Sequence, residues 1–177
     1  DITNNFYKKL VSKMDFNAEK VKNDIVEWIK DWFDKNGKGC KGVLGISGGK
    51  DSSVVAALLV EALGKENVVG VLMPNGEQFD IDVSKDLVEF LGIKSVTINI
   101  KDAYNGFLNE FKSNDVELSA QAITNLPPRL RMACVYAVSQ SVNGRVANTC
   151  NLSASPCWTC ICRCFNLFIE YSYVCIN

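Results

Sequence analysis

The sequence of 177 residues contains no histidine. This absence excludes a Ser-His-Asp triad, a Cys-His nucleophile pair and any zinc site with histidine ligands. Chemistry in this protein must therefore rest on carboxylates, lysine, arginine, hydroxyl groups, backbone amides and bound metal.

Long apolar runs and clusters of positive charge are also missing. No stretch approaches the roughly 18 apolar residues of a membrane-spanning helix, and no signal peptide opens the chain. The formal net charge is −1 and the basic residues are scattered, which argues against binding to nucleic acid or an anionic membrane. We therefore expect a cytoplasmic protein that binds neither nucleic acid nor membrane.

Helical and strand patterns alternate along most of the chain. Apolar residues at helical spacing predict an amphipathic helix over 17–35 with Asn17 as its N-cap, whose two tryptophans could serve the core and a dimer contact. Further helices are expected over 51–63 (apolar nearly all round, hence buried), 82–91, 102–111 and from Leu126-Pro127-Pro128 to about Gln140. Strands are expected over 42–46, 68–73, 95–100 and 145–149. This alternation predicts βαβ units and a parallel sheet.

A glycine-rich loop joins the first expected strand to the buried helix. It reads Ser47-Gly48-Gly49-Lys50-Asp51-Ser52. A glycine-rich turn at a helix N-terminus directs backbone N–H groups and the positive end of the helix dipole at one point, which suits phosphate. The glycines allow close approach of the backbone, the serines supply hydroxyls and Lys50 supplies charge.

Two familiar phosphate motifs do not fit this loop. A Walker loop needs glycine where Leu44 stands, and the glycine spacing of a Rossmann fingerprint is also absent. A tight turn without a ligand is the simpler alternative, but it gives no reason for serine, lysine and aspartate to occur together. Asp51 could complement the helix dipole or, beside phosphates, hold Mg²⁺.

The loop resembles that of the N-type ATP pyrophosphatases, which cleave ATP between its α and β phosphates. Three further segments resemble the NAD synthetase family within that superfamily. They are Met73-Pro74-Asn75-Gly76-Glu77-Gln78, the segment from Asn125 to Met132 with Arg129 and Arg131, and Thr149-Cys150-Asn151-Leu152-Ser153. The resemblance covers about residues 5–153.

The resemblance implies a doubly wound parallel sheet with flanking helices, of the adenine nucleotide alpha hydrolase-like type. It also implies amidation of deamido-NAD by ammonia, with ATP as co-substrate, Mg²⁺ and a homodimer. Lys50, Asp51 and Arg129 would be catalytic, with Mg²⁺ on Asp51. ATP would be bound by Ser47, Gly48, Gly49, Lys50, Asp51, Ser52, Gln78, Arg129 and Thr149, and deamido-NAD by Asn125 and Arg131. The short segment before the loop leaves no room for a glutaminase domain, so free ammonia is the expected nitrogen source.

The composition changes abruptly after residue 153. We expect residues 1–153 to form an ATP pyrophosphatase domain of the NAD synthetase type, incomplete at its C-terminal side, followed by an atypical cysteine-rich tail over 154–177. A frameshift would explain the tail. The alternatives are a natural divergent tail and a thiolate metal site formed by Cys157, Cys160, Cys162 and Cys164.

The position after the family's Thr-Gly-Asn-like turn is also unusual. The family has an acidic metal ligand there, whereas this chain has Ala154. We therefore expect the chain to bind ATP but to convert deamido-NAD poorly or not at all. Two other functions remain open, a tRNA-thiolating ATP pyrophosphatase, which only the tail cysteines support, and an inactive ATP-binding fragment.

Overall fold

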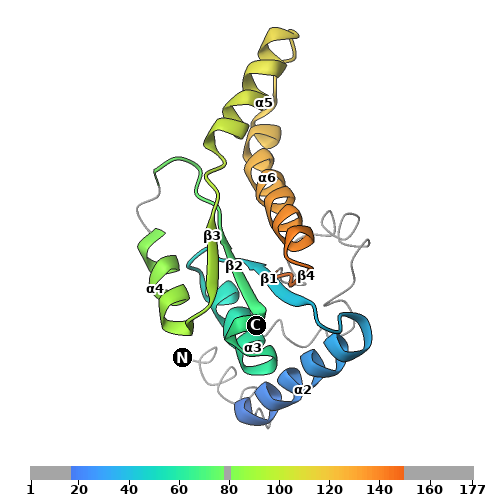
Figure 1. The fold of residues 1–177 in the computed structure, drawn as a ribbon. Helices are drawn as coiled ribbons and strands as arrows, with labels where there is room; N and C mark the ends of the chain where they lie inside the picture. The colour runs from blue at the N-terminus through green and yellow to red at the C-terminus, as the bar shows by residue number, and fades with distance from the viewer. Residues whose placement is uncertain (1–16, 78–80, 150–177) are drawn as a thin grey trace, which may run out of the picture.

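A computed structural model of the protein describes residues 17–77 and 81–149, and within these ranges one parallel sheet of four strands is covered by helices on both faces (Figure 1). The strands are β1 (Lys41–Gly45), β2 (Val68–Leu72), β3 (Lys94–Thr97) and β4 (Gly144–Val146), in the spatial order β3-β2-β1-β4. The chain winds outward from β1 through β2 to β3 and then returns to the other side of β1. This reversal is the doubly wound arrangement that the sequence predicted.

The helices are α2 (Ala18–Asn36), α3 (Lys50–Leu63), α4 (Ile81–Leu91), α5 (Lys101–Ser113) and α6 (Ala120–Ser141), with a short 3₁₀ turn η1 (Lys65–Asn67) before β2. One face of the sheet packs against α3 and α4, and α2 covers α3. The other face packs against α6. Figure 1 shows α5 and α6 lying side by side and extending beyond the sheet.

The core follows from the alternation of side chains along the central strands. Val43 and Leu44 are adjacent in β1 and both fully buried, but they belong to the clusters on opposite faces of the sheet. All five residues of β2 are buried, as expected of a parallel strand covered on both faces. The core thus fixes β1 and β2 as the rigid centre from which the loops at the carboxyl ends extend.

Helix α2 confirms its predicted start and its place in the core. Asn17 accepts a hydrogen bond from the backbone N–H of Lys20 at 3.0 Å. Ile29 and Phe33 are buried, while Trp28 and Trp32 are half-buried against the same cluster. Contact of the tryptophans with a second subunit stays a prediction.

The predicted start of α6 is wrong by about two turns. The helix begins at Ala120, where Ser119 Oγ accepts from the N–H of Ala122 at 3.2 Å, so Pro127 and Pro128 lie inside the helix. Proline has no N–H and normally interrupts a helix. Here the carbonyls that lose their partners belong to the exposed residues 123 and 124, where water can satisfy them.

Two smaller expectations also need correction. Helix α3 is not buried on all sides. Val54 is 54% exposed, and Ala57 and Glu61 are exposed beside it. Strands β3 and β4 are shorter than predicted, although Ile98 N–H still donates to the Leu72 carbonyl at 2.8 Å beyond the end of β3. In the part of the chain that the structure describes, no helix is both long and apolar enough to cross a membrane.

Candidate functional site

The candidate site lies at the edge of the sheet where the carboxyl ends of the parallel strands meet. The loop after β1 carries Ser47, the segment after β2 carries Met73 and Pro74, and the segment after β4 carries Thr149. The winding direction reverses between β1 and β4, and open parallel sheets bind ligands at this switch point.

Hydroxyl groups within the loop after β1 hold its shape. The Oγ atoms of Ser47 and Ser52 lie 3.2 Å apart, and the N–H of Gly49 donates to Ser47 Oγ at 3.3 Å. The hydroxyls of Ser52 and Ser53 donate to the carbonyl of Gly49 at 3.0 and 2.9 Å. The loop is therefore folded before any ligand arrives, which lowers the entropy lost on binding.

The N-terminus of α3 lacks a side-chain cap. Gly49 is its N-cap residue and offers no side-chain oxygen, whereas α2 and α6 are capped by Asn17 and Ser119. The amides of the first turn of α3 are thus available to an external anion, which the helix dipole favours. Lys50 and Asp51 are exposed in this same turn.

Position 48 requires glycine for two reasons, its backbone conformation and its surroundings. Its φ angle is +75°, in the left-handed region. A Cβ atom at this position would lie 3.1 Å from Ser84 Oγ of α4, and Ser84 is only 2% exposed. The loop therefore approaches α4 more closely than a side chain at residue 48 would allow.

Gly48→Ala is expected to destabilise the protein by about 2 kcal/mol, roughly half from the positive φ and half from the contact with Ser84. Gly39→Ala is the matched control, because Gly39 has a φ of +74° and no atom within 4 Å of its built Cβ. It should cost only about 1 kcal/mol. Urea unfolding measures both, and equal losses would contradict the close approach to Ser84.

A cavity of about 320 Å³ opens beside the loop at the carboxyl edge. Its wall combines three predicted site residues, Ser47, Arg131 and Thr149, with Pro74 and Ser84. The structure thus brings together side chains from segments up to about a hundred positions apart in the sequence.

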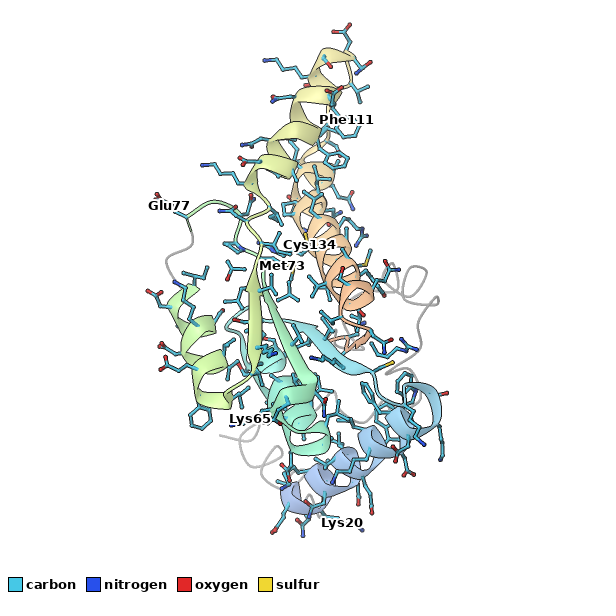
Figure 2. The ribbon with its side chains drawn as sticks, in the orientation of Figure 1. Lys20, Lys65, Met73, Glu77, Phe111 and Cys134 are labelled. Atoms are coloured by element: carbon cyan, nitrogen blue, oxygen red, sulfur yellow. The ribbon has the colours of Figure 1, made fainter. Side chains whose placement is uncertain are left out.

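Arg131 has a structural contact as well as a place in the cavity wall. Its Nε donates to the carbonyl of Met73 at 3.0 Å and ties α6 to the end of β2. Figure 2 shows Met73 beside α6, just beyond the end of β2. The guanidinium is therefore held in a defined orientation at the cavity.

Other predicted residues lie outside the cavity wall. Asn125 and Arg129 do not line it; they are four positions apart in α6 and share a helix face that differs from that of Arg131. Asn125 is exposed and Arg129 is half-buried. Gln78 and the residues from Cys150 onward, including Ala154 and the tail cysteines, lie outside the described residues.

Ser84 is a site residue that the sequence reasoning missed. It lies between Ile81 and Leu87 on the inward face of α4, where the helical pattern calls for an apolar residue. A small polar residue at such a position is the signal that could have identified it. Its burial against the loop follows from tertiary packing rather than from local sequence.

Comparison with known protein families agrees with this architecture. Residues 21–156 match the family model described as NAD synthase. The chain is 38% identical over 143 residues to the NH(3)-dependent NAD(+) synthetase of Fusobacterium nucleatum, covering 80% of this chain and 54% of that protein. It is 39% identical over 138 residues to the enzyme of the same name from Pyrococcus furiosus, covering 77% and 50%. The chain thus spans about half the length of these curated relatives.

Solved structures give the same fold. The NH3-dependent NAD synthetase from Campylobacter jejuni superposes with a TM-score of 0.69 at 28% identity, covering 77% of this chain and 58% of that one. The NMN synthetase from Francisella tularensis superposes with a TM-score of 0.68 at 32% identity, covering 77% and 56%. The fold is therefore the adenine nucleotide alpha hydrolase-like α/β fold, and the chain belongs to the NAD synthase family.

Proposed function

We propose that the protein catalyses the ATP-dependent amidation of deamido-NAD (nicotinic acid adenine dinucleotide) by ammonia, which yields NAD, AMP and pyrophosphate. The observation that carries this proposal is the uncapped N-terminus of α3, whose Ser-Gly-Gly-Lys-Asp-Ser loop contributes Ser47 to the wall of a cavity at the carboxyl edge of the sheet. Membership of the NAD synthase family supports the choice of substrates. The family match favours this function over a tRNA-thiolating enzyme.

In this proposal the loop binds the phosphates of ATP. The backbone N–H groups of Gly49 and Lys50 bind phosphate oxygens in this proposal. The hydroxyls of Ser47 and Ser52 also bind phosphate oxygens, in place of their hydrogen bonds within the loop. The bonds within the loop are 3.2 to 3.4 Å long where they join Ser47 to Gly49 and Ser52, so their replacement costs little. Thr149 lines the same cavity as Ser47, and we propose that it contacts the nucleotide there.

Lys50 and Arg129 supply positive charge in the proposed site, and Gln78 is a further proposed ATP ligand. The exposed ammonium of Lys50 can follow the phosphates as negative charge moves onto pyrophosphate. Arg129 would contribute from α6, which requires its side chain to reach past the cavity wall. Asn125 and Arg131 are proposed to orient deamido-NAD, and Arg131 already lines the cavity.

The donor set fits a magnesium ion that is held largely by substrate. Asp51 presents an exposed carboxylate in the first turn of α3. Among residues 17–77 and 81–149, no group of three cysteine, aspartate or glutamate side chains could hold a metal by itself. Mg²⁺ commonly binds one or two carboxylates together with phosphate oxygens, so Asp51 would hold it there. When bound, the ion neutralises part of the phosphate charge.

The proposed reaction needs no histidine. The carboxylate of the nicotinic acid ring attacks the α-phosphorus of ATP and pyrophosphate leaves, which forms an adenylated carboxyl group. Ammonia then displaces AMP and the amide results. The contribution of the protein is to align the two nucleotides and to stabilise the charge that develops on the phosphates.

The larger assembly is also a proposal. We place the catalytic domain in residues 1–153 and treat 154–177 as a separate cysteine-rich segment. The expected state is a homodimer, as the resemblance to the family implies, and the expected location is the cytoplasm.

A nitrogen-labelling experiment tests the reaction. With the chain in molar excess over deamido-NAD and with ATP and Mg²⁺ present, labelled ammonium should appear in the amide of NAD, and one AMP and one pyrophosphate should form for each NAD. The excess of protein registers even slow turnover, which matters because this chain has Ala154 where the resemblance to the family implies an acidic metal ligand. Mass spectrometry of the product and quantitation of AMP measure the outcome.

Three results would contradict the proposal. Label from the amide of glutamine, rather than from ammonium, would assign a different nitrogen source. Amidation of nicotinic acid mononucleotide in preference to deamido-NAD would place the protein with the NMN synthetase that shares its fold. Absence of AMP with every acceptor would identify an inactive member of the family.

A further inference from the structure

The segment that follows β2 turns away from the sheet at Gly76. Met73 and Pro74 line the cavity, and Gly76 has a φ of +84°. This left-handed conformation lets the chain bend sharply after it has formed the cavity wall. The position of the wall therefore depends on what holds residues 73–77.

One side chain from the neighbouring segment holds this bend. Asn99 lies just beyond β3, and its Oδ1 accepts from the N–H of Gly76 at 3.0 Å while its Nδ2 donates to the Gly76 carbonyl at 3.3 Å. The backbone N–H groups of Ile98 and Ile100 donate to the carbonyls of Leu72 and Pro74 at 2.8 and 2.9 Å. These bonds, two from the Asn99 side chain and two from the backbone, extend the β2–β3 pairing beyond the ends of the strands.

The same oxygen also begins α5. Asn99 Oδ1 accepts from the N–H of Lys101, the first residue of α5, at 3.0 Å. The N-cap position of α5 is Ile100, which has no side-chain cap of its own. Asn99 therefore couples the start of α5 to the cavity wall through a single carboxamide.

We propose that Asn99 is a positioning residue for the nucleotide site, because it holds Gly76 and thereby fixes the segment 73–76, in which Met73 and Pro74 form part of the cavity wall. Arg131 anchors the other end of this segment at the Met73 carbonyl, so the wall is held at both ends. A wall that is ordered before binding loses less entropy when a nucleotide enters. The inference rests on the proposed function for the identity of the ligand, ATP.

Two substitutions separate positioning from helix capping. Asn99→Ala removes all three hydrogen bonds. Asn99→Asp keeps the acceptor for Lys101, and aspartate caps helices as well as asparagine does. It faces the Gly76 carbonyl with a carboxylate oxygen in place of a donor, so only the bend is weakened. Asn105→Ala, at an exposed position within α5, is the control.

Hydrogen exchange and ATP titration are the measurements. In the ligand-free chain, Asn99→Ala should speed exchange of the Gly76 amide by about tenfold. ATP with Mg²⁺ should bind about tenfold more weakly to Asn99→Ala and about threefold more weakly to Asn99→Asp. The melting temperature of Asn99→Asp and all properties of Asn105→Ala should match those of the parent.

Each contrary outcome has a distinct meaning. Unchanged exchange at Gly76, or faster exchange with unchanged ATP affinity, overturns the positioning role. Parental ATP affinity in Asn99→Asp, with binding and melting temperature lost together in Asn99→Ala, reduces Asn99 to a helix cap. A parent chain that does not bind ATP contradicts the proposed function and removes this role with it, whereas the exchange data still report whether the bend is held.

Discussion

Lys50→Ala is expected to weaken the binding of ATP with Mg²⁺ by about 30- to 150-fold, because a charge-assisted contact with phosphate is worth roughly 2–3 kcal/mol. Lys50 is exposed, and no ion pair joins it to another of the residues that the structure describes. The folded protein therefore loses no internal contact, and the melting temperature should stay unchanged. Isothermal titration of ATP and a thermal melt measure the two quantities.

Lys35→Ala is the control for the loss of one positive charge. Lys35 is exposed near the end of α2 and pairs only loosely with Asp31, at 3.7 Å. Its replacement should leave ATP affinity unchanged, because Lys35 lies before the amino end of β1 whereas the loop follows the carboxyl end of this five-residue strand. Surface charges that are separated by more than a Debye length of about 8 Å are largely screened at physiological salt. Asp51→Asn should also weaken binding when Mg²⁺ is present. Unchanged affinity in both Lys50→Ala and Asp51→Asn would remove the loop from the proposed phosphate site.

The parts of the fold that could be predicted are those encoded by local patterns. Short apolar runs identified β1 and β2, and the helical spacing with Asn17 identified α2 nearly to the residue. Helix α6 shows the limit of this reasoning. Pro127 and Pro128 suggested a helix start, but Ser119 provides the cap and the prolines lie within the helix. The general rule that proline interrupts a helix does not take account of exposure. Here the two carbonyls that lose an N–H donor are exposed, so water can replace the missing hydrogen bonds.

The candidate site shows the same limit: contacts between residues close in the sequence could be predicted, and contacts between distant residues could not. The loop from Ser47 to Ser52 was visible in the sequence, because its glycines and hydroxyls act within six residues of one another. The cavity wall was only partly visible. The contact of Arg131 with Met73 joins residues 58 positions apart, and that of Asn99 with Gly76 joins residues 23 apart. Such pairs depend on the order of strands in the sheet, which local periodicity does not determine.

The loop leads into helix α3, which is anchored in the core of the protein. Helix α3 begins at Lys50 and is anchored by Leu59, which is fully buried in the core cluster that α2 and the sheet share with α3. A Cβ atom built on Gly42 of β1 would lie 3.2 Å from Leu59 Cδ2, so this side chain rests directly on the central strand. Leu59→Ala should therefore destabilise the protein more than any other single change considered above.

The expected loss for Leu59→Ala is about 3–4 kcal/mol, or roughly 6–15 °C in melting temperature, because the transfer free energy of the leucine side chain is lost and a cavity remains. Val54→Ala is the control on the same helix, since Val54 is 54% exposed, and it should change stability by less than about 0.5 kcal/mol. Urea unfolding measures both variants.

At urea concentrations well below its unfolding midpoint, folded Leu59→Ala should bind ATP with near-parental affinity, because the first turn of α3 keeps its own hydrogen bonds. A large loss of affinity in that folded state would show that the core controls the loop directly, and equal destabilisation by both variants would contradict the central place of Leu59 in the core.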